Sequence, residues 1–211
     1  CIMAISYTLS LPTVTGIAQI ELRATNAVAY SRSPFTFAGQ AHAYAGQMWQ
    51  ADVTLPAMNR ASAEEWVSFL ISLRGQFGTF LLGDPAGATP RGLAATLAGS
   101  PTVDGANQTG GTLDITGASR NKTNWLRAGD YIQIGTGSNS KLYKVLTNTN
   151  TNNSGQCTVD IWPHIRTAHA NGASITTSNA KGLFRLAANE TSWSVNEASI
   201  YGITFGAMEA L

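Results

Sequence analysis

The stretch WQADVTL, residues 49–55, decides how this chain is built. Its apolar residues, Trp49, Ala51, Val53 and Leu55, alternate strictly with polar ones. Successive side chains of a β-strand point to opposite faces, so this alternation predicts a strand with one buried face and one wet face. We therefore expect the fold to be built on a sheet that has one covered side.

A helical spacing follows this strand. Large apolar side chains recur at i, i+3, i+4 and i+7, which places them on one face of a helix. These are Trp66, Phe69, Leu70 and Leu73. We predict the helix near residues 60–74, with Asn59 as its N-cap or Ser62 in a capping box with Glu65. Gly75 supplies the left-handed residue at which a helix commonly ends.

Further extended segments are predicted upstream. Residues 5–11 and 17–32 alternate apolar and polar side chains, and Pro34 makes a corner because it biases the residue before it toward extended geometry. Gly39 and Gly46 bracket a short segment, which we interpret as a hairpin arm.

The middle of the chain differs in composition, being rich in Asn, Thr and Gly. Short strands are predicted there at residues 113–115, 131–134, 141–146, 157–161, 174–177 and 183–186. This density of short strands predicts a small barrel or sandwich. A strand pair at residues 193–206 again resembles the first part of the chain. We therefore predict that residues 1–90 and 187–211 form one domain, into which residues 91–186 are inserted as a second.

Charge is scarce in this sequence. Charged residues make up 12% of the chain, about half of the usual share. Small neutral polar groups cost less to desolvate than charges, so such a surface suits extensive protein–protein contact, although an ordinary extracellular β protein would share it. A net charge of +1 without a basic cluster predicts no specific nucleic-acid binding. No apolar run is long enough for a membrane-spanning helix, so membrane insertion is not expected.

The first residues leave one question open. The start Cys1–Ile2–Met3–Ala4 has neither the basic nor the long apolar region of a signal peptide. A cysteine at this place fits a processed lipoprotein terminus, or two extra residues before a start at Met3. We expect no structural disulfide between Cys1 and Cys157, because chain ends fray.

Catalytic chemistry is not indicated. The histidines have no cysteine at the spacing of a metal site, and residues 135–140 precede a strand pattern, which favours a hairpin turn over a phosphate-binding loop. A glycosidase needs two convergent carboxylates, for which scattered aspartates are the only candidates. The histidines are His42, His164 and His169, and the aspartates are Asp104, Asp114, Asp130 and Asp160. We predict that the chain is not an enzyme and has no catalytic residue, cofactor or metal.

Two tryptophans motivate an alternative function. Trp125 and Trp162 have rings of the kind that stack on sugars, although core packing is the commoner use of such side chains. If they are exposed, a carbohydrate- or receptor-binding module is the alternative to a purely structural role.

Three groups of motifs resemble one known family. They are Ser33–Pro34–Phe35–Thr36 through Trp49 and Leu55–Pro56; Ala63–Glu64–Glu65–Trp66 through Leu73–Arg74–Gly75 and Phe80–Leu81–Leu82–Gly83–Asp84–Pro85; and Leu126–Arg127–Ala128–Gly129–Asp130–Tyr131–Ile132–Gln133–Ile134–Gly135, Ile161–Trp162–Pro163 and Lys181–Gly182–Leu183–Phe184–Arg185–Leu186. Together they cover nearly the whole chain and resemble the distal tail proteins of siphophages that infect Gram-negative bacteria.

This resemblance implies a mainly β fold and an assembly role. It implies an N-terminal β-sandwich with one α-helix, which forms a ring with other copies, usually a hexamer, and a second β domain outside the ring. The ring would continue the tail tube and join it to the baseplate hub at the tail tip of the virion. On this hypothesis His42, Tyr44 and Trp49 are candidate residues for contact between copies.

Overall fold

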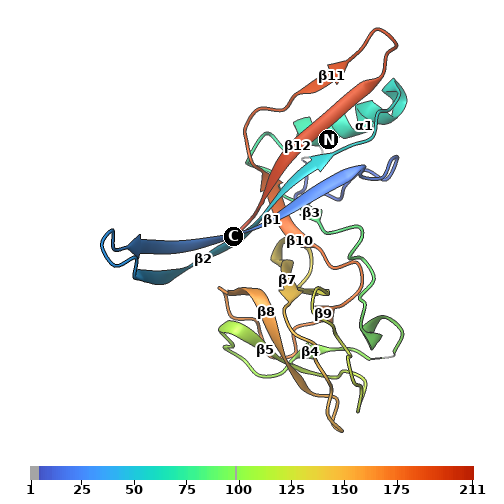
Figure 1. Ribbon diagram of the computed structural model, residues 1–211. Helices are drawn as coiled ribbons and strands as arrows, with labels where there is room; N and C mark the ends of the chain where they lie inside the picture. Colours follow the sequence, from blue (N-terminus) through green and yellow to red (C-terminus); the bar gives the residue numbers. More distant parts are fainter. Residues whose placement is uncertain (1–4, 98) are drawn as a thin grey trace.

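A computed structural model describes residues 5–97 and 99–211. Within these residues the chain is mainly β, with a single α-helix and two sheets (Figure 1). The predicted fold class, a β-sandwich with one helix interrupted by a small β-barrel, is confirmed. Residues 1–4, which include Cys1 and Met3, lie outside the described part.

The first sheet holds the strands nearest the two ends of the sequence. In spatial order they are β1 (Gln19–Arg32), β2 (Gly39–Thr54), β12 (Tyr201–Glu209), β10 (Gly182–Leu186) and β3 (Phe80–Leu82), with β11 (Trp193–Val195) pairing with β12. The stretch 49–55 lies at the centre of this sheet, where β12 pairs with its residues 50–54. Its alternation follows the burial, since Trp49, Ala51 and Val53 are buried.

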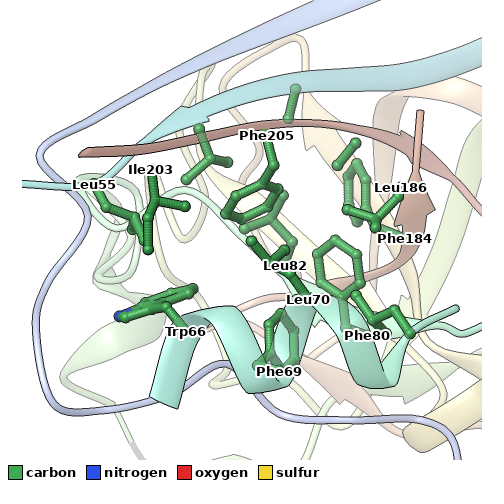
Figure 2. Packing of buried hydrophobic residues seen from close by; sticks show 14 of the residues in the cluster. Leu55, Trp66, Phe69, Leu70, Phe80, Leu82, Phe184, Leu186, Ile203 and Phe205 are labelled. Atoms are coloured by element: carbon green, nitrogen blue, oxygen red, sulfur yellow. The ribbon is translucent and has the colours of Figure 1, made fainter. Parts of the chain in front are cut away.

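One helix covers this sheet. α1 (Arg60–Ser72) begins at Asn59, whose side-chain oxygen accepts a hydrogen bond from the Ser62 amide at 3.1 Å. Of the two caps left open by the sequence, Asn59 is therefore the one used. The predicted face packs on the sheet, where Trp66 and Phe69 meet aromatic side chains of β3 and β12 (Figure 2). Each such aromatic side chain contributes about 1.5–3 kcal/mol by its burial.

The second sheet curls toward a barrel with its own core. Its strands, in spatial order, are β4 (Thr102–Val103), β5 (Gly110–Thr116), β8 (Cys157–Ile165), β7 (Lys141–Val145), β6 (Tyr131–Ile134) and β9 (Ile175–Thr176). A bridge between Thr102 and Ser174 brings the two outer strands together and nearly closes the sheet. Residues 135–140, including the short 3₁₀ turn η2 (Gly137–Asn139), connect β6 and β7 as the predicted hairpin turn.

Two predictions about the first sheet were wrong. Residues 5–11 form no strand; only Leu9 makes a bridge, to Phe80, while the segment rests its alternating apolar side chains on the core. Residues 183–186 were assigned to the inserted region, but β10 pairs with β3 and β12 of the first sheet. The strand belongs there because Phe184 is fully buried in the core under α1.

The linker between the domains is fixed by a carboxylate. Residues 85–101 contain only one 3₁₀ turn, η1 (Leu93–Ala95), among those described. The Asp130 side chain, which is almost fully buried, accepts hydrogen bonds from the amides of Arg91, Gly92 and Arg127 at 2.7–3.1 Å. Asp130 thus ties the linker to the turn before β6.

No helix among the described residues has the length and apolar character needed to cross a membrane.

Candidate assembly interface

The first two strands leave the domain core as one long hairpin (Figure 1). We call residues 19–26 and 47–54 the root, and residues 27–46 the arm. β12 pairs with β2 only at residues 50–54, so no described strand flanks the arm on either edge. Every arm residue except Ser33 is exposed. The short hairpin predicted between Gly39 and Gly46 is wrong, because these residues belong to the single strand β2 and the hairpin turns at residues 33–38.

The end of the arm is an ordered turn. The Ser33 amide donates to the Ala38 carbonyl at 2.9 Å, and the Ser33 hydroxyl oxygen accepts from the Phe35 amide at 3.3 Å. A serine that bonds the backbone ahead of it is a common turn device. The guanidinium of Arg32 lies 4.5 Å from the ring centre of Phe37. These contacts give the turn a defined shape without any support from the core.

One side of the arm continues the covered side of the sheet. In the root this side carries Trp49, Ala51 and Val53, which are buried. At the bulge after Asn26, one residue of β1 lies opposite three residues of β2. The two strands therefore differ by two residues, and because two is even, each side chain stays on the side of the sheet that the alternation gives it. The same side therefore continues in the arm as Val28 and Tyr30, which lie opposite Ala43 and Ala41. Tyr30 is 66% exposed, so this apolar side has lost its cover.

The other side of the arm holds two of the predicted contact residues. His42 and Tyr44 are both exposed, and their rings meet edge to face with centres 4.7 Å apart. At the end of the arm, Phe35 is 92% exposed. The arm thus presents aromatic side chains on both sides and at its turn, as protein interfaces often do.

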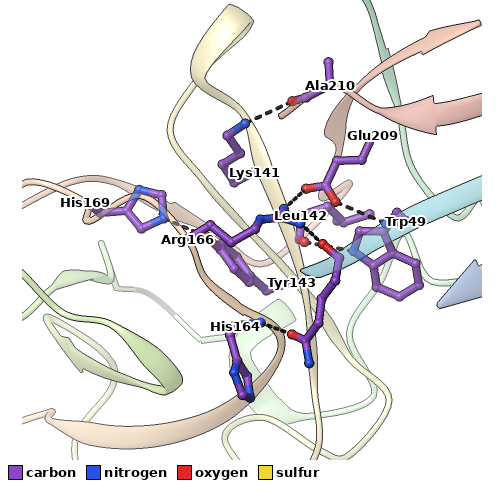
Figure 3. Close-up of polar contacts among 10 residues, drawn as sticks. Trp49, Lys141, Leu142, Tyr143, His164, Arg166, His169, Glu209 and Ala210 are labelled. Carbon is purple, nitrogen blue, oxygen red and sulfur yellow. Dashed lines mark hydrogen bonds and ion pairs between the residues drawn. The ribbon is translucent and has the colours of Figure 1, made fainter. Parts of the chain in front are cut away.

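Trp49 was wrongly grouped with these contact residues. It lies in the root and is 3% exposed. Its ring packs edge to face on Trp162 with centres 4.6 Å apart, and its Nε1 donates to the Leu142 carbonyl at 3.0 Å (Figure 3). The strand alternation that predicted burial of Trp49 already excluded its use by a neighbouring copy.

A buried ion pair joins the root to the barrel. Arg166, from the end of β8, forms an ion pair with Glu209 of β12 and also donates to the Gln47 carbonyl. The second carboxylate oxygen of Glu209 accepts from the Trp49 amide at 3.1 Å (Figure 3). Glu209 is buried, so these partners replace the hydration that its carboxylate loses on folding. The arm therefore leaves a root that is fixed to both domains.

Titratable side chains line a cavity of about 380 Å³ beside this ion pair. Burial lowers the pKa of Lys141, whose ammonium donates to the Ala210 carbonyl at 3.0 Å. Burial also raises the pKa of Tyr143 to about 12 and lowers the pKa of His169. The Tyr143 hydroxyl and the His169 Nε2 are 2.9 Å apart. Each of these groups thus has a partner within the protein.

The two candidate sugar-stacking tryptophans are placed differently. Trp125 is 2% exposed in the barrel core and cannot reach a ligand. Trp162 is half-buried, and its Nε1 donates to the Asn26 side chain at 2.8 Å. The structure does not bring the two together on one surface, so it does not support the alternative in which both stack on a sugar, and Trp125 has the core-packing use that was favoured.

The candidate catalytic groups form hydrogen bonds of ordinary structural kinds. Asp114 accepts from the Thr158 hydroxyl, Asp160 from the Thr147 hydroxyl and Asp104 from the Gln156 amide. Asp130 holds the linker, as described above. In the part of the chain that the structure describes, no three His, Cys, Asp or Glu residues gather as metal ligands would.

Comparisons with known proteins add no family assignment. No model of a known protein family matches the sequence, and a search of curated proteins found no match. The resemblance to distal tail proteins therefore stays a hypothesis that depends on the quoted motifs.

Sequence reasoning missed the length of the arm and the ion pair at its root. The arm had a signal: the residues on both sides of Pro34 alternate for similar lengths, as the two strands of a hairpin do. The pairing of Arg166 with Glu209 had none, because Arg166 follows β8 of the second sheet, Glu209 lies in β12 of the first, and only the folded structure brings them together.

Proposed function

We propose that this chain is a structural protein of a long-tailed phage, which assembles into a ring at the tail tip and joins the tail tube to the baseplate hub. The observation that carries the proposal is the arm: a two-stranded ribbon with exposed aromatic side chains and uncovered edges. The motif resemblance supplies the identity of the assembly.

The physical case begins with the cost of such an arm. Exposed strand edges and apolar side chains promote aggregation, and monomeric proteins avoid or shield them. In the arm neither the strand edges nor the apolar side chains are shielded. The root that anchors the arm is fixed by its contacts with both domains. An arm of this kind is favourable if a neighbouring molecule covers it. The low content of charged residues reduces the desolvation cost of that cover.

The placement of the quoted motifs supports the same proposal. Residues 33–36 form the turn of the arm, and residues 63–75 form most of α1 and its end. Residues 80–85 and 181–186 contribute the neighbouring strands β3 and β10. Most of the motifs that suggested the family therefore occupy the arm and the sheet that anchors it, while residues 126–135 and 161–163 lie in the barrel at β6 and β8.

The alternative, a carbohydrate-binding module, is less well supported. It depended on Trp125 and Trp162, and the first of these is buried in the barrel core. We therefore propose a single function.

The test is to shorten the arm. Asn26 and Gln47 face each other across the hairpin, so replacing residues 27–46 by Asn-Gly closes it with a favoured two-residue turn. We expect the full chain to form closed rings in negative-stain electron microscopy and native mass spectrometry, and the shortened chain to be monomeric. Phage carrying the shortened chain should produce tails that lack a complete tip.

Two controls make this result decisive. Circular dichroism should show that the shortened chain is folded, because its root contacts are unchanged. A full chain that remains monomeric at every concentration and is absent from purified tails would contradict the proposal.

A further inference from the structure

A second uncovered hairpin projects from the first sheet. β11 pairs with the start of β12, and the residues from Ser192 to Ile200 are all exposed. Trp193 and Val195 of β11 lie opposite Ile203 and Tyr201, so all four side chains point to one side of the hairpin. That side begins at Ile203, which is buried in the core under α1 (Figure 2).

This hairpin repeats the main feature of the arm. In both, the covered side of the sheet continues past its cover as apolar side chains: Val28 and Tyr30 in the arm, Trp193 and Val195 in the hairpin. Trp193 is 43% exposed, and Tyr30 is 66% exposed. The first sheet therefore carries two apolar surfaces that the described chain leaves open.

The two surfaces have opposite charge. The arm carries Arg32, and no Asp or Glu occurs between Glu21 and Asp52. The hairpin carries Glu197 in its turn, Glu190 lies three residues before β11, and no Lys or Arg occurs after Arg185. In the described part of the chain, neither glutamate belongs to an ion pair. Opposite charges on two apolar surfaces favour their contact and set its orientation.

The two surfaces also lie toward opposite lateral edges of the first sheet. β1 forms one edge, whereas β11 lies on the side of β12 that faces away from β2. Figure 1 shows the arm and the β11–β12 hairpin projecting in different directions from the body. The arm therefore cannot cover the hairpin of its own chain, and a second copy of the chain is the occupant that fits both surfaces.

We infer that the arm of one copy docks on the β11–β12 hairpin of the next, with Tyr30 against Trp193 and Arg32 near Glu190 or Glu197. Because two different surfaces meet, the contact is head to tail, and a head-to-tail contact closes into a ring when its rotation allows. Aromatic side chains bury about 150–250 Å² each. Tyr30, the aromatic side chains at the turn of the arm and Trp193 supply part of the roughly 1,200 Å² or more that specific interfaces bury, whereas His42 and Tyr44 lie on the other side of the arm. This inference rests on the proposed ring and names the surface that receives the arm.

Charge reversal on each surface tests the contact. Arg32→Glu reverses the arm, and Glu190→Lys combined with Glu197→Lys reverses the hairpin. Each variant alone should form rings at least about 10-fold more weakly, because like charges then face each other. Mixed in equal amounts, the two variants should form rings that alternate between them, because every arm then faces a hairpin of opposite charge. Native mass spectrometry distinguishes these species by their masses.

The controls separate this inference from the proposed function. Arg120→Glu reverses an exposed charge between β5 and β6 of the second sheet, outside the first sheet that carries both surfaces, and should leave assembly unchanged. A wild-type chain that never assembles would overturn the ring itself. Wild-type rings that tolerate the hairpin reversal, or variants that do not assemble on mixing, would overturn only the docking of the arm on this hairpin.

Discussion

The root and the arm belong to the same two strands, yet they have opposite relations to the rest of the chain. In the root, Trp49 is almost fully buried and bonded to the barrel, whereas in the arm Tyr30, on the same side of the hairpin, is exposed. The alternation of residues continues from the root into the arm, although alanine and glycine weaken it at residues 39–46, so strand pattern alone does not distinguish a covered strand from an uncovered one. The difference is whether another layer covers the strand. The comparison indicates that the root stabilises the monomer, whereas the described chain leaves the arm uncovered.

The largest expected effect on the free energy of unfolding comes from removing the buried Trp49 side chain from the root. Trp49→Ala in the shortened-arm chain removes a ring that packs on Trp162 and Tyr131 and a donor to the Leu142 carbonyl. Replacing a buried tryptophan by alanine costs about 3–5 kcal/mol, because a cavity adds to the lost transfer free energy. We expect urea unfolding to show this loss in the free energy of unfolding.

The matched control is the shortening itself. Deletion of the arm should change the stability of the diluted monomer by less than about 0.5 kcal/mol, as surface changes commonly do. If the deletion of the arm destabilises the monomer as much as Trp49→Ala does, the division between root and arm is incorrect.

The next effect concerns the ion pair at the root. Arg166→Met leaves the Glu209 carboxylate buried without its cation, which typically costs about 3–5 kcal/mol. Because the Arg166 side chain is 22% exposed, we expect the lower end of that range. Adding Glu209→Gln removes the unpaired charge and should recover part of the loss. The measurement is a double-mutant cycle of urea unfolding, and two additive losses would contradict a direct coupling of these residues.

The same contrast shows how far sequence reasoning reaches. The helix and the strand at residues 49–55 were predicted because their apolar periods are set by burial within one short segment. The arm was underestimated, since residues 39–46 alternate mainly with alanine and glycine and give a weak pattern. Residues 5–11 have a strand period but lie at the edge of β3, where only Leu9 forms a bridge. Periodicity shows which side chains are buried, and it does not show which strand or which molecule buries them.

The site was predicted less completely than the fold. His42 and Tyr44 were placed on an exposed arm, as expected, while Trp49 was not. The contacts of Arg166 and the course of β10 depend on how two sheets pack together, and no local pattern in the sequence encodes that. Contacts of this kind require the three-dimensional structure.

The smallest expected effect is a pH dependence confined to the junction beside the root. Burial raises the pKa of Tyr143 to about 12, and its hydroxyl lies 2.9 Å from His169. Below pH 10 the phenol is neutral in both states, so its contribution is constant. Between pH 10 and 12 the unfolded chain releases the proton while the folded chain keeps it, and stability falls by about 2–3 kcal/mol. Cys157, with its pKa also raised to about 12 by burial, adds a loss that begins near pH 9.

Tyr143→Phe isolates the contribution of the phenol. At neutral pH the variant should lose only about 0.5–1.5 kcal/mol, the value of one hydrogen bond. Its stability should then fall less steeply than that of the wild type between pH 10 and 12, while the earlier loss due to Cys157 remains. Urea unfolding of the shortened-arm chain at a series of pH values measures both slopes without interference from assembly. Equal slopes would mean that the phenol ionises as readily in the folded protein as in the unfolded chain, and that the junction beside the root is not closed to water.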